Sequence, residues 1–131
     1  MAIIVGYVPT PEGVAALDTA IEEAQLRGQR LVVVNSSRGE SLVDPRFAGN
    51  AEWHSVDQRL ADSGVEHELT QLVESKDAAD QILDLAKELN AELIVIGLRR
   101  RTPVGKLIMG SQAQTILLEA ECPVLAVKNP R

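Results

Sequence analysis

The sequence predicts one α/β domain over residues 1–131, built on a doubly wound, five-stranded parallel sheet with four helices. Three observations predict this fold class. Short apolar runs rich in β-branched residues alternate with segments of helical periodicity, and glycine or proline closes most of these segments. One run, residues 93–96, is continuously apolar, which is typical of a central parallel strand covered on both faces.

The first strand–helix unit starts almost at the N-terminus. Its strand is expected to end near Val8, because the proline-containing segment that follows cannot continue a strand. Thr10 is a suitable N-cap for the first helix, with Pro11 at the first helical position and Gly28 at the end. Local chemistry therefore predicts both ends of this helix.

The second unit contains the least regular part of the chain. An apolar strand over residues 31–34 is followed by a polar stretch over residues 35–50 that contains two glycines and a proline. Asn50 can cap a second helix, which is expected to stop at Gly64.

The remaining elements follow at similar spacing. Residues 65–72 alternate apolar and charged side chains, which suits a third strand near the edge of the sheet, and Ser75 is expected to cap a third helix. The last predicted elements are the central strand at 93–96, a fourth helix running to about Ala120, and a fifth strand at 123–127.

Composition and charge exclude several classes of function. The chain is 45% hydrophobic and 24% charged, which is the balance of an ordinary globular domain. A net charge of -6 argues against duplex DNA, and a single Tyr, Phe and Trp are too few to stack a single-stranded nucleic acid. One cysteine and two separated histidines predict neither a disulfide nor a resident metal site. The basic residues gather late in the chain, and three of them are consecutive, at residues 99–101.

No apolar run approaches the roughly 18 residues that a membrane helix needs. The first residues also lack the basic region and cleavage site of a secretory signal. We therefore expect a cytoplasmic protein with neither a membrane nor a nucleic acid as its partner.

The segment from Gly97 to Ser111 is the densest functional feature. It is not a Walker A loop, because seven residues separate Gly97 from Gly105 and leucine follows Lys106. It does lead from the central strand to Gly110 and Ser111 at a helix start, where unpaired backbone N–H groups and a hydroxyl can hold a phosphate. The plainer interpretation makes Gly97 a tight turn and Ser111 a helix cap.

This spacing resembles the nucleotide-binding signature of the universal stress protein family, G-x2-G-x9-G-[ST]. The resemblance covers the whole chain, including the opening strand and its Pro/Thr turn, the LIVIG run before the signature, and the final Cys-Pro-Val-Leu-Ala-Val. It implies a sheet of order 3-2-1-4-5, an adenine nucleotide alpha hydrolase-like fold, an ATP or AMP site between strands 1 and 4, and a homodimer.

Carried onto this sequence, the resemblance implies particular residues. Magnesium would enter only with a nucleotide. The homodimer would form through the last strand, at Val124, Leu125, Ala126 and Val127. The implied nucleotide-binding residues are Val8, Pro9, Thr10, Gly97, Arg99, Arg100, Gly110, Ser111 and Gln112.

Three departures from the family pattern leave two functions open. Val8 stands where nucleotide-binding members usually carry an acidic residue, Arg100 replaces the second signature glycine, and Ala113 replaces a frequent hydroxyl residue. The first hypothesis is a stress-response regulatory protein that binds ATP or AMP and hydrolyses ATP slowly at most. The alternative is a dimeric interaction module that has lost nucleotide binding. A flavin-type electron-transfer subunit has little support, because so few aromatic side chains could flank the flavin.

The other chemically notable residues have plain interpretations. Cys122 has no motif partner that would make it a thiolate, so we expect an inert buried thiol. His54 and His67 lie in no catalytic motif, and Trp53 and Met109 are expected to be packing residues. The arginine run at 99–101 is either part of the phosphate cradle or a solvated loop.

Overall fold

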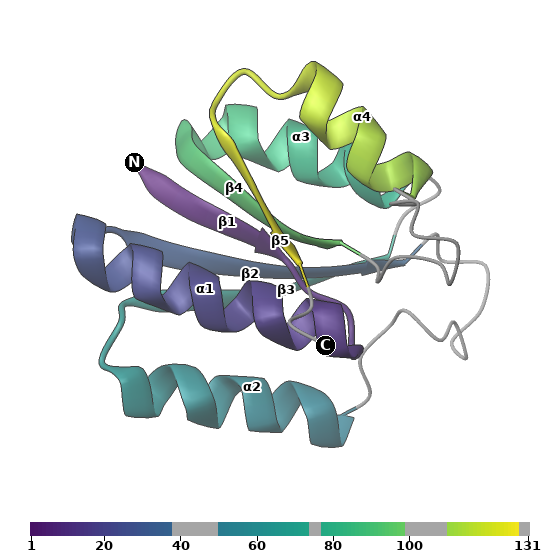
Figure 1. The fold of residues 1–131 in the computed structure, drawn as a ribbon. Coiled ribbons are helices and arrows are strands. Elements are labelled where there is room, and N and C mark those ends of the chain that lie inside the picture. Colours follow the sequence, from purple (N-terminus) through teal and green to yellow (C-terminus); the bar gives the residue numbers. More distant parts are fainter. Residues whose placement is uncertain (38–49, 74–76, 99–109, 129–131) are drawn as a thin grey trace.

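The computed structural model describes residues 1–37, 50–73, 77–98 and 110–128, which form one parallel sheet covered by helices (Figure 1). The strand order is β3-β2-β1-β4-β5, and every pair of neighbouring strands is parallel. The predicted fold class and strand order are therefore confirmed. The elements are β1 Ala2–Gly6, α1 Pro11–Arg27, β2 Arg30–Ser37, α2 Asn50–Ser63, β3 His67–Val73, α3 Ala78–Leu89, β4 Ala91–Leu98, α4 Ser111–Glu119 and β5 Val124–Lys128.

The helices lie on both faces of the sheet, with α1 and α2 on one side and α3 and α4 on the other (Figure 1). Alternate residues of the central strands point to opposite faces, so each face has its own core. Ile3 and Val5 pack with Leu17 of α1, whereas Ile4 packs with Ile82 of α3 and Ile116 of α4. Both faces of β1 are thus buried, which explains its unbroken apolar sequence.

Several predicted boundaries are corrected by the structure. β1 ends at Gly6 rather than near Val8, β3 begins at His67 rather than at residue 65, and β5 extends to Lys128, which pairs with Leu98. Sequence patterns locate such ends only to within a few residues, because pairing with the neighbouring strand decides where a strand stops.

The helix ends show the same contrast between local and tertiary control. Thr10 caps α1 as predicted, with its Oγ1 accepting a hydrogen bond from the Gly13 N–H at 3.1 Å. The predicted cap of α3 is wrong, because Asp77 holds the N-cap position and Ser75 lies outside the described residues. None of the helices within the described ranges is long and apolar enough to cross a membrane.

Candidate functional site

A cavity of about 540 Å³ opens at the carboxyl edge of the sheet, beside the ends of β1 and β4. Its walls come from the ends of β1, β2 and β4, the turn after β1, and the first turns of α1, α3 and α4. The connection from β1 runs to β2 on one side, while β4 flanks β1 on the other, so the strand order switches here. Parallel sheets bind ligands at such switch points, and the volume is in the range of small-molecule sites.

The floor of the cavity is apolar. Val34, Ala79, Ile82 and Ile96 line it, and each exposes 5% or less of its surface in the folded chain. Gly6 adds a stretch of backbone without a side chain. An apolar floor of this kind offers a dispersion surface to a flat ring system but no hydrogen-bond partner.

The rim of the cavity gathers the first turns of three helices. Unbonded backbone N–H groups at a helix start favour anions, and the helix dipole adds to the effect. Ser111 lies at the first position of α4, and Gly110 before it has extended backbone with φ -65° and ψ 155°. The N-terminal turn of α4 therefore lies at the cavity, and it is the turn for which the sequence predicts phosphate binding.

Gln112 does something that the sequence did not indicate. Its Oε1 accepts a hydrogen bond from the Ala79 N–H at 2.8 Å, so a side chain of α4 caps the first turn of α3. The side chain of Asp77, the N-cap residue of α3, makes no capping bond. The two partners lie 33 residues apart, so no local pattern could have revealed this bond.

The structure brings together some of the predicted site residues and leaves others apart. Pro9 and Gly97 are not among the described residues that line the cavity, and Arg99 and Arg100 lie outside the described residues. The predicted residues that do line it are Val8, Thr10, Gly110, Ser111 and Gln112.

Gly97 has a packing role at the end of β4. A Cβ added there would lie 2.3 Å from the carbonyl oxygen of Glu12, so only glycine lets the first turn of α1 approach this strand. Val8 and Gly13 make a comparable contact, because a Cβ at Gly13 would lie 1.9 Å from the Val8 carbonyl oxygen. These two glycines allow the start of α1 to lie close against the turn after β1 and the carboxyl end of β4.

Two further residues at the site were missed by the sequence analysis. Asn35 is fully buried in the second half of β2; its Nδ2 donates to the Tyr7 carbonyl at 2.9 Å, and its Oδ1 accepts from Gln71 at 3.2 Å. The first of these bonds fixes the backbone at Tyr7, which follows β1 and lines the cavity. The available signal was an amide residue directly after an apolar run. The second residue is Glu12, an acidic residue that lines the cavity from the first turn of α1.

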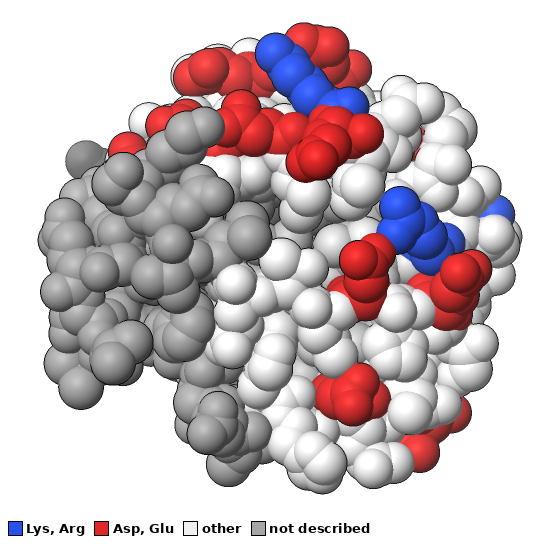
Figure 2. All heavy atoms as spheres, turned by 180° about the vertical axis from the view of Figure 1, so that it is seen from behind, with Lys and Arg blue, Asp and Glu red and all other residues white. Residues whose placement is uncertain are grey.

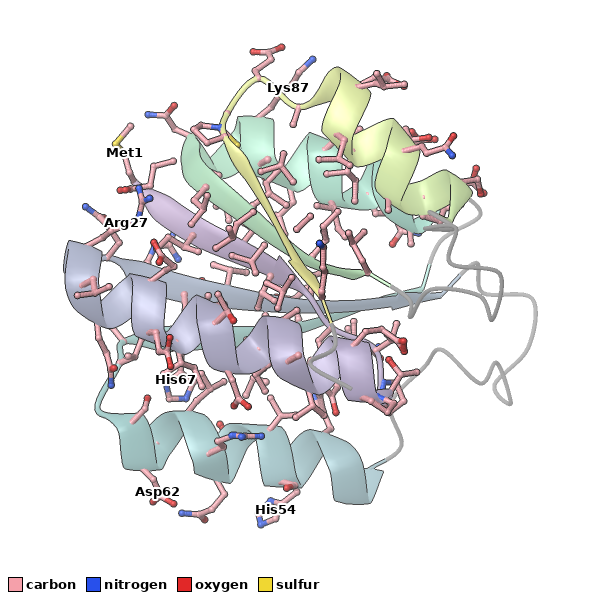
Figure 3. The ribbon with its side chains drawn as sticks, in the orientation of Figure 1. Met1, Arg27, His54, Asp62, His67 and Lys87 are labelled. Atoms are coloured by element: carbon pink, nitrogen blue, oxygen red, sulfur yellow. The ribbon has the colours of Figure 1, made fainter. Side chains whose placement is uncertain are left out.

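The remaining candidates lie elsewhere. His54 points outward from α2, while His67 lies between β3 and α2, with its Nε2 3.4 Å from the Asp57 carboxylate (Figure 3). Trp53 packs against the core and its ring lies 6.4 Å from that of Tyr7, as expected of a packing residue. The described ranges contain no group of three or more His, Cys, Asp or Glu that could hold a metal ion.

Cys122 is half-buried rather than buried, in the connection between α4 and β5. Burial raises the pKa of its thiol, because a thiolate would lose solvation there. It lines a second hollow of about 600 Å³ with Lys87 and several carboxylates of α3 and the α4–β5 connection. Figure 2 shows acidic side chains gathered around a basic one at the top of the molecule, the end at which Figure 1 places α3 and α4.

Comparison with known proteins decides the family. The model of the Universal stress protein family matches residues 1–128. The chain belongs to the universal stress protein family. It is 49% identical to a universal stress protein of Mycolicibacterium smegmatis over 126 residues, which cover 96% of each chain. A universal stress protein of Thermus aquaticus is 33% identical, over 96% of this chain and 97% of the relative.

Solved structures of universal stress proteins have the same fold. A universal stress protein from Archaeoglobus fulgidus superposes with a TM-score of 0.84 at 35% identity, covering 98% of both chains. The structure of the universal stress protein from the same organism in complex with dAMP superposes with a TM-score of 0.73 at 30% identity, again over 98% of both chains.

Proposed function

We propose that this universal stress protein binds an adenine nucleotide, ATP or AMP, in the cavity between β1 and β4 and acts as a regulatory protein rather than an enzyme. The observation that carries the proposal is the pairing of an apolar floor with a rim of helix N-termini at the switch point of the sheet. The relative from Archaeoglobus fulgidus solved with dAMP supports adenine nucleotides as the ligand class.

Each part of the cavity suits a different part of the nucleotide. The adenine ring would pack on the floor of Val34, Ile82 and Ile96, where dispersion and loss of apolar hydration favour a flat ring. The phosphates would bind the backbone amides at the start of α4, together with the exposed Ser111 hydroxyl. Thr10 Oγ1 already accepts a bond from Gly13, which leaves its hydroxyl proton to donate to the ligand.

The alternative function, an interaction module without nucleotide binding, is favoured by Val8. This apolar side chain lines the cavity at the place where the family resemblance implies a carboxylate. Measuring whether the protein binds ATP or AMP decides between the two functions.

The test is calorimetric titration of ATP and AMP into nucleotide-free protein. Ser111→Asp places a negative charge at the phosphate end while keeping a residue suited to a helix start. Two like charges about 4 Å apart repel by roughly 1–4 kcal/mol between bulk water and a protein surface, so ATP affinity should fall about fivefold or more. Gln114→Asp is the matched control, because it adds the same charge to α4 at an exposed residue that is not among those lining the cavity.

Two results would contradict nucleotide binding at this place. Wild-type protein that takes up neither nucleotide at millimolar concentration would favour the interaction module. Equal loss of ATP affinity in Ser111→Asp and Gln114→Asp would show that the phosphates do not bind at the start of α4.

We also propose that the protein is a homodimer that pairs through β5. This strand lies at the edge of the sheet, and its apolar residues from Val124 to Val127 are only half-buried. An edge with unpaired backbone groups and apolar side chains favours pairing with a second copy. Leu125→Lys should shift the protein toward monomer in sedimentation velocity while its circular dichroism stays that of the folded chain. Wild-type protein that sediments as a monomer at micromolar concentration would overturn the proposal.

A further inference from the structure

We propose that Glu12 recognises the ribose of the bound nucleotide, with its carboxylate accepting hydrogen bonds from the 2′- and 3′-hydroxyl groups. This inference rests on the proposed nucleotide binding and adds a specificity-determining residue to it.

The backbone of Glu12 is held in place at the switch point of the sheet. It lies in the first turn of α1, directly after the segment that leads from β1 to α1 and also lines the cavity. On its other side it contacts the end of β4, where the Cβ position of Gly97 is 2.3 Å from the Glu12 carbonyl oxygen and 3.2 Å from the Glu12 Cβ. The absence of a side chain at Gly97 is therefore what allows Glu12, in the first turn of α1, to lie against the end of β4 beside the cavity.

The chemistry of the cavity explains what a carboxylate there can bind. Among the described residues that line it, Glu12 is the one with a charged side chain at neutral pH. An ionised carboxylate only accepts hydrogen bonds, so its complement must be a donor, and it repels phosphate. The apolar floor suits the base, and the amides of α4 suit the phosphates. The part of a nucleotide that joins these two and carries hydroxyl donors is the ribose.

A plainer role for Glu12 makes a different prediction. An acidic residue in the first turn stabilises a helix through its dipole. That role would change the stability of the protein on substitution, but it gives no reason for the protein to distinguish one sugar from another. Discrimination between sugars is therefore the readout that separates the two roles.

The experiment measures the affinities of AMP and of 2′,3′-dideoxy-AMP for wild type, Glu12→Gln and Glu12→Ala by calorimetry. In wild type, hydrogen bonds to a charged acceptor should favour AMP by about 10-fold or more. The preference should shrink in Glu12→Gln, whose neutral amide oxygen still accepts, and fall to within about twofold in Glu12→Ala. The readout is the ratio of the AMP affinity to the 2′,3′-dideoxy-AMP affinity of each variant. Deleting a charge near the phosphates would raise both affinities alike, so it leaves this ratio unchanged. Glu22→Ala is the matched control, since Glu22 is an exposed acid farther along the same helix.

The outcomes separate this inference from the proposed function. If wild type binds neither nucleotide, the proposed function is overturned, and the ribose role with it. If wild type binds both equally, or if Glu12→Ala keeps the full preference for AMP, nucleotide binding stands and the role of Glu12 is overturned. A preference lost equally in Glu12→Ala and Glu22→Ala would also overturn it.

Discussion

Replacing Gly97 with alanine should destabilise the protein, although the same change in an ordinary strand position would stabilise it. A Cβ at Gly97 would lie 2.3 Å from the carbonyl oxygen of Glu12 and 2.8 Å from its carbonyl carbon. Both atoms belong to the backbone of α1, so no side-chain rotation can relieve the contact. The first turn of α1 would have to move away from β4, and it is also held against Val8 through Gly13.

The size of the effect follows from two opposing contributions. Forcing an extra methyl group into a packed contact costs roughly 1–3 kcal/mol, and a backbone clash this short belongs at the upper end. Alanine restricts the unfolded chain more than glycine does, which returns about 0.4–1 kcal/mol. A net loss of about 2 kcal/mol remains, which lowers the urea midpoint by roughly 1 M for a domain of this size.

Urea denaturation of Gly97→Ala beside Gly110→Ser tests this reasoning. Gly110 has an ordinary φ of -65°, and no atom of the described residues lies within 4 Å of its Cβ position. Serine is a preferred N-cap, so the control should change stability by less than about 0.5 kcal/mol. If Gly97→Ala is as stable as the wild type, the close approach of α1 to β4 is refuted.

Three further predictions concern Asn35, Cys122 and Arg100. Asn35→Leu removes a buried donor to Tyr7 and an acceptor for Gln71, so it should lower the free energy of unfolding by about 1–3 kcal/mol in urea titrations; an unchanged midpoint would contradict the network. Because burial raises the pKa of the Cys122 thiol, iodoacetamide at pH 8 should alkylate folded protein more slowly than urea-unfolded protein, and equal rates would contradict this. Arg100 lies outside the described residues; if it pairs with a phosphate, Arg100→Ala should weaken ATP binding about 10- to 100-fold, since a charge-assisted bond contributes roughly 1.5–3 kcal/mol. Tighter binding by Arg100→Gly would show that the side chain obstructs the site, and equal affinities would remove it from the site.

The sequence by itself determined the fold class, the strand order through the family resemblance, and the helix ends that depend on neighbouring residues. Thr10 caps α1 by accepting a hydrogen bond from a backbone N–H only three residues away, so a short stretch of sequence is enough to predict its role. The apolar run at 93–96 likewise indicated a central strand, because burial on both faces of one strand requires every residue in it to be apolar.

Only the tertiary structure decided how the cavity is built. Gln112 caps Ala79 from 33 residues away, Asn35 bonds Tyr7 from 28 residues away, and Gly97 is a glycine because of Glu12, near the other end of the chain. Each of these contacts joins residues of different elements, and whole helices and strands lie between the two partners in the chain. Hydrophobic periodicity reports which face of an element is buried, but it carries no record of which distant backbone group a polar side chain will meet. The residues that shape this site can therefore be identified only from the tertiary structure, in which the carboxyl ends of the strands lie side by side.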